Sequence, residues 1–243
     1  MDSKDENVAS RRRLPRGLRE ERFFRWRGGD VSRIEALSDA VFAFSLTLLV
    51  VALEVPQSSD QLVAVFWQFP AFALCFVFLL WVWFEHYLYY RRFGFEDAVT
   101  VGLNGLLLFF VVFYVYPLKF LASALITDDL LNQGNVTFGT HGRTVMWLYS
   151  GGFVGIFSVF SLLYARAWWL REELELDEAE RVVTRGALTG HLASVVIGLA
   201  SIALAFVIPV LSGLIYFAMG PVQGWNGFRT GRKLKGVATD PGA

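Results

Sequence analysis

Six stretches of this 243-residue chain are long and apolar enough to be membrane-spanning helices. A helix needs about 20 apolar residues to cross roughly 30 Å of hydrocarbon. The composition agrees, because 55% of the residues are hydrophobic and 16% are aromatic, more than a soluble domain of this length needs. Backbone polar groups in lipid must be satisfied within their own segment, so the sequence predicts an all-α membrane protein. The predicted spans are residues 36–55, 62–85, 98–122, 144–166, 187–207 and 209–227.

The boundary between the last two spans is the least defined by hydropathy. Residues 192–220 form an almost unbroken apolar run, which can be one long helix or two. Pro209 favours a break, because proline lacks a backbone donor and disfavours helix at the residue before it. Ser212 and Gly213 also suit a tight reversal.

Basic residues predict the orientation of the spans, since arginine and lysine concentrate on the cytoplasmic side. The first 33 residues hold nine arginines and one lysine, and the 86–97 link, the 167–186 link and the tail are also basic. In the other three links, the only basic residue is Arg143. Six spans with both termini in the cytoplasm satisfy every segment, whereas five spans put the basic tail outside. The predicted organisation is a basic leader (1–32), a six-helix membrane domain (33–228) and a short cytoplasmic tail (229–243).

The sequence shows none of the motifs that carry catalysis or bind a cofactor. It has no glycine-rich phosphate loop, no Cys/His cluster with metal spacing and no nucleophile–base pair at usable spacing, so neither an enzyme nor a cofactor is expected. The single cysteine, Cys75, excludes an intramolecular disulfide. The basic leader suits anionic lipid headgroups, and a nucleic-acid partner is not expected beside a membrane span. The leader also precedes an apolar stretch too long for a signal-peptide core, which predicts a retained span.

Polar residues lie in and beside the first span, where each needs a partner. An ionisable group at a helix centre costs roughly 2.5–3.5 kcal/mol on insertion scales. Arg33, Ser38 and Asp39 lie at the cytoplasmic end of this span, and His86 at the same end of the second span is a candidate bridge between Arg33 and Asp39. The alternative is that Arg33 reaches toward the headgroups, Asp39 caps the helix and His86 is an ordinary interfacial residue.

Further along the first span, Phe44, Thr47, Leu48 and Val51 share one helical face. This face is consistent with a stripe that contacts lipid or other helices, with Thr47 bonding to its own backbone. It is also consistent with a pore wall, because rings of apolar side chains can gate a channel by dewetting.

Three separated elements of the sequence stand out in order along the predicted spans. The first span carries Arg33, Ser38-Asp39, Thr47-Leu48-Leu49 and Val55-Pro56, the second carries Trp83 and His86, and the third carries Leu103-Asn104 and Pro117. Together these elements resemble the bacterial branch of the transmembrane protein 175 potassium channels. The resemblance covers roughly the first half of the chain.

This resemblance implies a homotetramer of six-helix subunits in which the first helix of each lines a central, potassium-selective pore. The constriction falls at Phe44, with Leu48 and Val51 as further rings and Thr47 as a hydroxyl layer. Arg33, Ser38, Asp39 and His86 form a polar network that holds the pore helices together. The implied partners are other copies of the chain, membrane lipids and K⁺ as the permeant ion, in the plasma membrane.

Three residues depart from the family pattern. Leu37 replaces a phenylalanine, Tyr87 stands where many members have a second histidine, and Phe44 replaces a branched aliphatic residue at the constriction. Four phenyl rings narrow a pore more than four aliphatic side chains, which affects conductance or selectivity. The alternative function is a secondary transporter that uses Asp39 and His86 as a proton relay.

Overall fold

The computed structural model describes residues 23–51, 57–60, 62–63, 69–126 and 142–239, and the regular secondary structure in these ranges is helical throughout. The all-α prediction is confirmed for this part of the chain. The helices are α2 (Arg33–Val51), α4 (Phe69–Phe93), α5 (Ala98–Ile126), α7 (Gly142–Trp169), α8 (Glu178–Ala205), α9 (Pro209–Leu214) and α10 (Met219–Thr239), with the 3₁₀ turn η3 (Ile215–Ala218) before α10.

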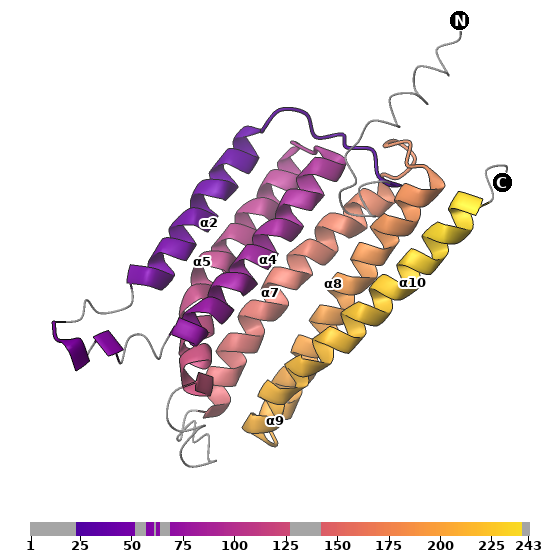
Figure 1. Ribbon diagram of the computed structural model, residues 1–243. Coiled ribbons are helices and arrows are strands. Elements are labelled where there is room, and N and C mark those ends of the chain that lie inside the picture. The colour runs from indigo at the N-terminus through magenta and orange to yellow at the C-terminus, as the bar shows by residue number, and fades with distance from the viewer. Residues whose placement is uncertain (1–22, 52–56, 61, 64–68, 127–141, 240–243) are drawn as a thin grey trace, which may run out of the picture.

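The long helices run side by side in one bundle, with α2 at one edge and α10 at the opposite edge (Figure 1). Helix α2 packs on α4 and α5, α7 lies between α5 and α8, and α10 packs on α8. The first residues of α2, the links after α4 and α7 and the last residues of α10 lie at the same end of the bundle (Figure 1). The predicted topology places these basic segments on one side of the membrane, and the identity of that side stays a prediction.

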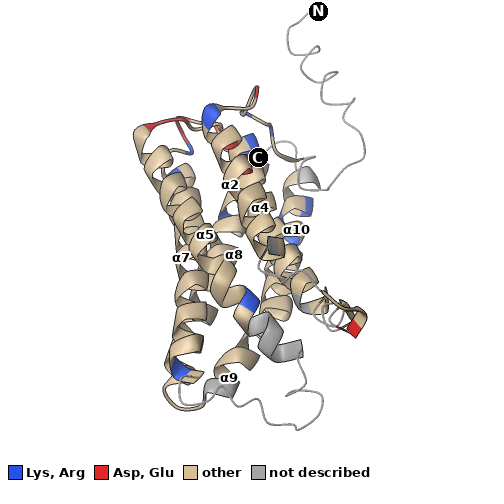
Figure 2. Cartoon of the chain, turned by 90° about the vertical axis from the view of Figure 1, so that its left-hand side faces the viewer, with Lys and Arg blue, Asp and Glu red and all other residues tan. Residues whose placement is uncertain are grey.

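Four of the described helices are long and apolar enough to cross a membrane, within α4, α5, α7 and α8. Long stretches of the helices carry no charged residue (Figure 2). The chain is therefore an integral membrane protein. Helix α2 has 19 residues and carries Arg33, Glu35 and Asp39 in its first two turns, while α10 carries no charged residue before Arg229. Six spans with both termini in the cytoplasm remain a prediction.

The predicted second span, 62–85, is displaced in the structure, because α4 starts at Phe69 and continues to Phe93. Arg91 and Arg92 suggested a link, but Arg92 is buried and donates a hydrogen bond to the Tyr164 hydroxyl at 3.2 Å. The helix ends where Gly94 takes a φ of +62°, a left-handed conformation that glycine adopts without strain. His86 thus lies two turns inside the helix.

Helix α8 begins at Glu178, nine residues before the predicted start of the fifth span at 187. The Asp177 carboxylate accepts from the Glu180 backbone N–H at 2.8 Å, and the Glu180 carboxylate accepts from the Asp177 N–H at 3.1 Å. This capping box satisfies two N–H groups that lack helical partners. Residues 178–185, predicted as part of the 167–186 link, therefore belong to the fifth helix, and residues 170–177 connect α7 to α8.

The predicted break at Pro209 is confirmed. Ile208 is extended (φ −140°, ψ 97°), and Pro209 is the first residue of α9. The sixth span, predicted at 209–227, is not one helix, because η3 separates α9 from α10. Helix α10 continues to Thr239, so the segment predicted as a tail is helical over most of its length.

Glycines on α7 and α8 allow neighbouring helices to approach closely. A Cβ atom on Gly155 of α7 would lie 2.6 Å from Cε1 of Phe110 on α5. On α8, a Cβ on Gly186 would lie 2.6 Å from Oγ1 of Thr230 on α10. Small residues at such positions favour helix association in membranes, where packing replaces the hydrophobic effect between helices. The bundle that holds α2 in place is therefore tightly packed.

Candidate functional site

Helix α2 starts at a defined residue. The Ser32 hydroxyl accepts from the Glu35 N–H, and the Glu35 carboxylate accepts from the Ser32 N–H, each at 3.2 Å. This Ser-x-x-Glu pattern is a capping box, which fixes the first turn of the helix.

One face of α2 is buried within the subunit and the other is exposed. Hydroxyls on the buried face bond back to the helix, with Ser38 Oγ donating to the Ile34 carbonyl at 2.8 Å and Ser45 Oγ to the Val41 carbonyl at 2.9 Å. The buried face comprises Glu35, Ser38, Phe42, Ser45 and Leu49. The opposite face, which we call the open face, comprises Ala36, Leu37, Ala40, Ala43, Phe44, Thr47 and Val50.

Two of the four predicted pore residues, Phe44 and Thr47, lie on the open face. Phe44 is 56% exposed, and Thr47 is exposed with its hydroxyl donating to the Ala43 carbonyl at 2.9 Å. Leu48 lies at the edge of the open face and packs partly against the core. The side chain of Val51 lies outside the described residues. At 100° per residue, the middle of the open face runs through Ala36, Ala40 and Thr47. Measured around the helix axis from Thr47, Phe44 lies about 60° away and Leu48 about 100° away.

A polar network joins α2 to α4 and α5, with Asn104 at its centre. Asn104 Nδ2 donates to Ser38 Oγ at 3.0 Å, and its Oδ1 lies 2.9 Å from His86 Nε2. The amide oxygen only accepts, so the ring hydrogen of His86 lies on Nε2. All three residues are buried. The network fixes the rotation of α2 so that its open face points away from its own subunit.

The structure therefore brings together two of the four predicted network residues, Ser38 and His86. Asp39 is held separately, because its carboxylate accepts a 2.8 Å hydrogen bond from Trp83 Nε1 on α4. Arg33 is exposed and makes no hydrogen bond or ion pair with another described residue. His86 does not bridge Arg33 and Asp39 within one subunit, and a contact of Arg33 with another subunit stays a prediction.

Asn104 and Trp83 are hydrogen-bond partners of α2 that reasoning from span positions missed. Both belong to sequence elements that mark the family resemblance, but nothing in the spacing shows that they contact α2. A pairing between residues 38 and 104 depends on how three helices pack, which hydropathy does not encode. An amide in an apolar span is nonetheless a usable signal, because it requires a partner.

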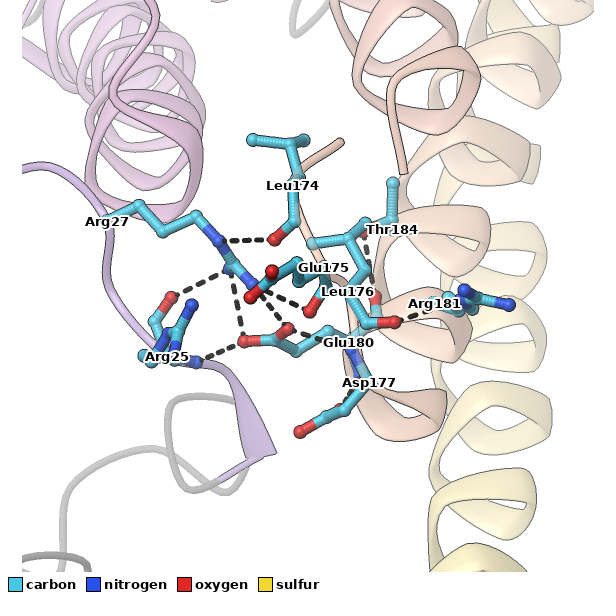
Figure 3. A network of polar contacts seen from close by, with 9 residues as sticks. All are labelled: Arg25, Arg27, Leu174, Glu175, Leu176, Asp177, Glu180, Arg181 and Thr184. Atoms are coloured by element: carbon cyan, nitrogen blue, oxygen red, sulfur yellow. Dashed lines mark hydrogen bonds and ion pairs between the residues drawn. The ribbon is translucent and has the colours of Figure 1, made fainter. Parts of the chain in front are cut away.

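Residues 23–29 form a second feature that the sequence did not indicate, and we call this segment the N-terminal strap (Figure 3). Both oxygens of Glu180 accept from the Arg27 guanidinium, at 2.7 and 3.1 Å, and Glu180 Oε1 also accepts from the Arg25 N–H at 2.7 Å. The Arg27 and Gly28 N–H groups donate to the Arg91 carbonyl at 3.1 and 3.2 Å. The strap thus ties the segment before α2 to the end of α4 and the start of α8.

A second ionisable pair lies deeper in the bundle. His191 Nε2 on α8 is 3.6 Å from Glu85 Oε2 on α4, and the imidazole stacks on the Phe160 ring with centroids 5.1 Å apart. The other Glu85 oxygen accepts from Trp81 Nε1 at 3.2 Å. In the described ranges no three His, Cys, Asp or Glu residues are grouped so that they could hold a metal ion.

The proteins that this chain resembles in sequence are named as potassium channels. A family model described as "Endosomal/lysosomal potassium channel TMEM175" matches residues 33–114, the segment that contains α2 and the Ser38–Asn104–His86 network. A protein from Marivirga tractuosa named "Potassium channel" is 33% identical over 234 residues, covering 89% of this chain and 94% of the relative. This chain belongs to the TMEM175 family. A second relative, a potassium channel from Chamaesiphon minutus, is 31% identical over 146 residues, covering 57% of this chain and 66% of its own length.

Solved TMEM175 structures share the fold. A crystal structure of a variant of the potassium channel MtTMEM175, bound to a nanobody–MBP fusion, matches with a TM-score of 0.74 at 32% identity, covering 86% of this chain and 97% of that one. The lysosomal potassium-selective channel TMEM175 homologue from Chamaesiphon minutus matches with a TM-score of 0.57 at 27% identity, covering 82% and 96%. The resemblance found in the sequence is confirmed, and it extends into the second half of the chain.

Proposed function

We propose that this chain is one subunit of a homotetrameric potassium channel that conducts K⁺ passively across the plasma membrane. Relatives and solved structures of the family are named as potassium channels. These names support K⁺ as the permeant ion and a channel rather than an enzyme. The proposed subunit has six spans with both termini in the cytoplasm, between the basic leader at 1–32 and the tail at 229–243.

The observation that carries the proposal is the division of α2 into two faces. Ser38 on the buried face bonds to α5 and the neighbouring Asp39 bonds to α4, while the side chains of the open face are exposed in the single subunit. A helix at the edge of a bundle with such a face is suited to line an axis shared by several subunits. The Ser38, Asp39 and His86 contacts then hold the pore wall in position, and Arg33 lies beside the entrance.

On this axis the proposed constriction is a ring of Phe44 side chains, with Leu48 and Val51 as further apolar rings. Such rings control conduction by excluding water from a narrow pore. Thr47 supplies a polar layer: its hydroxyl hydrogen is engaged by the Ala43 carbonyl, which leaves oxygen lone pairs to face a hydrated cation. The pore needs no cofactor, since K⁺ moves down its own gradient.

Potassium flux from liposomes tests this proposal. Purified protein is reconstituted into vesicles with a K⁺ gradient, and flux is measured with and without a pH gradient. A channel gives K⁺ flux that requires no pH gradient. This flux increases with the K⁺ concentration and does not saturate at low K⁺ concentrations, as the flux of a transporter would. Flux equal to that of empty vesicles contradicts the proposal, and flux that requires a pH gradient favours the transporter that uses Asp39 and His86. Asp39→Asn and His86→Gln variants separate the two, because only the transporter loses its coupling to protons.

A further inference from the structure

The inner face of α10 fixes how this helix sits on α8. Gln223 Nε2 donates to the Gly190 carbonyl and to Ser194 Oγ, both at 3.0 Å, and Asn226 Nδ2 donates to the Gly186 carbonyl at 2.9 Å. These bonds lie on one side of α10, so they determine which side chains point away from the bundle.

The outer face of α10 combines aromatic and basic side chains. Trp225 and Phe228 are 68% and 66% exposed, with ring centroids 6.2 Å apart. Arg229 and Arg232 follow on the same side of the helix and are exposed, and Lys233 and Lys235 are exposed next to them. No Asp or Glu occurs between Glu180 and Asp240 in the sequence, so α10 itself carries no acidic side chain.

The order of these residues matches the structure of a membrane interface. Aromatic rings favour the boundary between hydrocarbon and headgroups, and the cations lie up to two turns further toward the end of the bundle where α2 begins. Helix α10 is at the opposite edge of the bundle from α2 (Figure 1). If α2 lines the pore, as the proposed function states, α10 is the outermost helix and faces lipid.

We propose that the outer face of α10, comprising Trp225, Phe228, Arg229, Arg232, Lys233 and Lys235, is a binding site for anionic phospholipids. The guanidinium groups of Arg229 and Arg232 bind the headgroup phosphate through paired hydrogen bonds, and the two lysines add positive charge. Trp225 and Phe228 pack against the upper part of the acyl chains. A basic residue beside an anionic membrane surface raises affinity roughly fivefold.

Native mass spectrometry of the intact protein tests this site. The protein is released from nanodiscs that contain equal amounts of phosphatidylglycerol and phosphatidylcholine, and the lipids retained on each subunit are counted. The wild type is expected to retain phosphatidylglycerol preferentially. The double variant Arg229→Gln/Arg232→Gln is expected to lose this preference by roughly tenfold or more. The variant Arg229→Lys/Arg232→Lys is expected to keep most of it, because the charge remains.

A charge-matched control is Lys119→Gln/Arg143→Gln, which removes two cations from α5 and α7 and is expected to keep the preference. Equal retention of both lipids by the wild type, or an unchanged preference in Arg229→Gln/Arg232→Gln, overturns the proposal. The substituted arginines are exposed, so both variants are expected to fold. Lipid retention is measured without K⁺ flux, so a protein that binds phosphatidylglycerol but conducts nothing contradicts the channel and not the lipid site.

Discussion

Replacing Arg27 by methionine tests whether the N-terminal strap holds the bundle through its ion pair. The Arg27 side chain is 12% exposed and that of Glu180 is 2% exposed, so removing the guanidinium leaves an almost fully buried carboxylate. Breaking one partner of a buried ion pair costs about 3–5 kcal/mol. Glu180 keeps the N–H donors of Arg25 and Asp177, which places the expected loss at the lower end, about 3 kcal/mol.

The assay is unfolding of the purified protein in mixed micelles by titration with a denaturing detergent. Arg171→Met is the matched control, because Arg171 pairs with Glu172 at 3.1 Å and the Glu172 side chain is 75% exposed. An exposed pair contributes about 0–1 kcal/mol. Arg27→Lys retains the charge and loses the two-pronged geometry, so it is expected to fall between the two. If Arg27→Met lowers the unfolding free energy no more than Arg171→Met does, the strap does not stabilise the bundle as described.

Three further predictions concern the pore, the network and the link between α4 and α5. Phe44→Ala should widen the constriction and increase K⁺ current in planar bilayers, whereas Phe109→Ala, which removes an equally exposed ring from α5, should not; equal currents in both variants remove Phe44 from the pore. Asn104→Leu should lower the unfolding free energy by about 1–3 kcal/mol, because His86 Nε2 loses its acceptor in a buried site; a variant as stable as the wild type contradicts the network. Partial burial raises the pKa of Asp97, but hydrogen bonds from Thr100 and from the Val99 N–H, together with Arg166, outweigh it and hold the pKa below the usual 3.8. The stabilisation by Asp97 is therefore present above pH 3.8 and is lost as the pH falls through its lower folded-state pKa. The loss of unfolding free energy on acidification should be smaller in Asp97→Asn than in the wild type, and it should be unchanged in Asp30→Asn.

Hydropathy predicted the class of the fold and several helices, because long apolar runs have few alternatives in a membrane protein. The third and fourth spans, expected at 98–122 and 144–166, appear as α5 (Ala98–Ile126) and α7 (Gly142–Trp169). The break at Pro209 followed from backbone chemistry. The errors lie where charged or polar residues are buried, since Arg92 and Glu180 resemble loop residues in a hydropathy plot.

The candidate site was predictable only in part. The position of Phe44 and Thr47 on one helical face follows from their spacing, and the structure shows that this face is the exposed one. The partner of Ser38 and His86 was not predictable, because Asn104 reaches both through the packing of α5 against α2 and α4. The strap contact between Arg27 and Glu180 spans more than 150 residues in the sequence and follows from the fold as a whole.

The most direct test of the account is whether the open face of α2 borders the path of K⁺. Thr47→Cys and Ser45→Cys are made in a Cys75→Ala background, and K⁺ current is recorded in planar bilayers before and after a water-soluble thiol reagent is added. Thr47 is on the open face and Ser45 is buried against the subunit. The account predicts that the reagent blocks current through Thr47→Cys and leaves Ser45→Cys unaffected. Current through Thr47→Cys that the reagent leaves unchanged, or equal block of both variants, would contradict it.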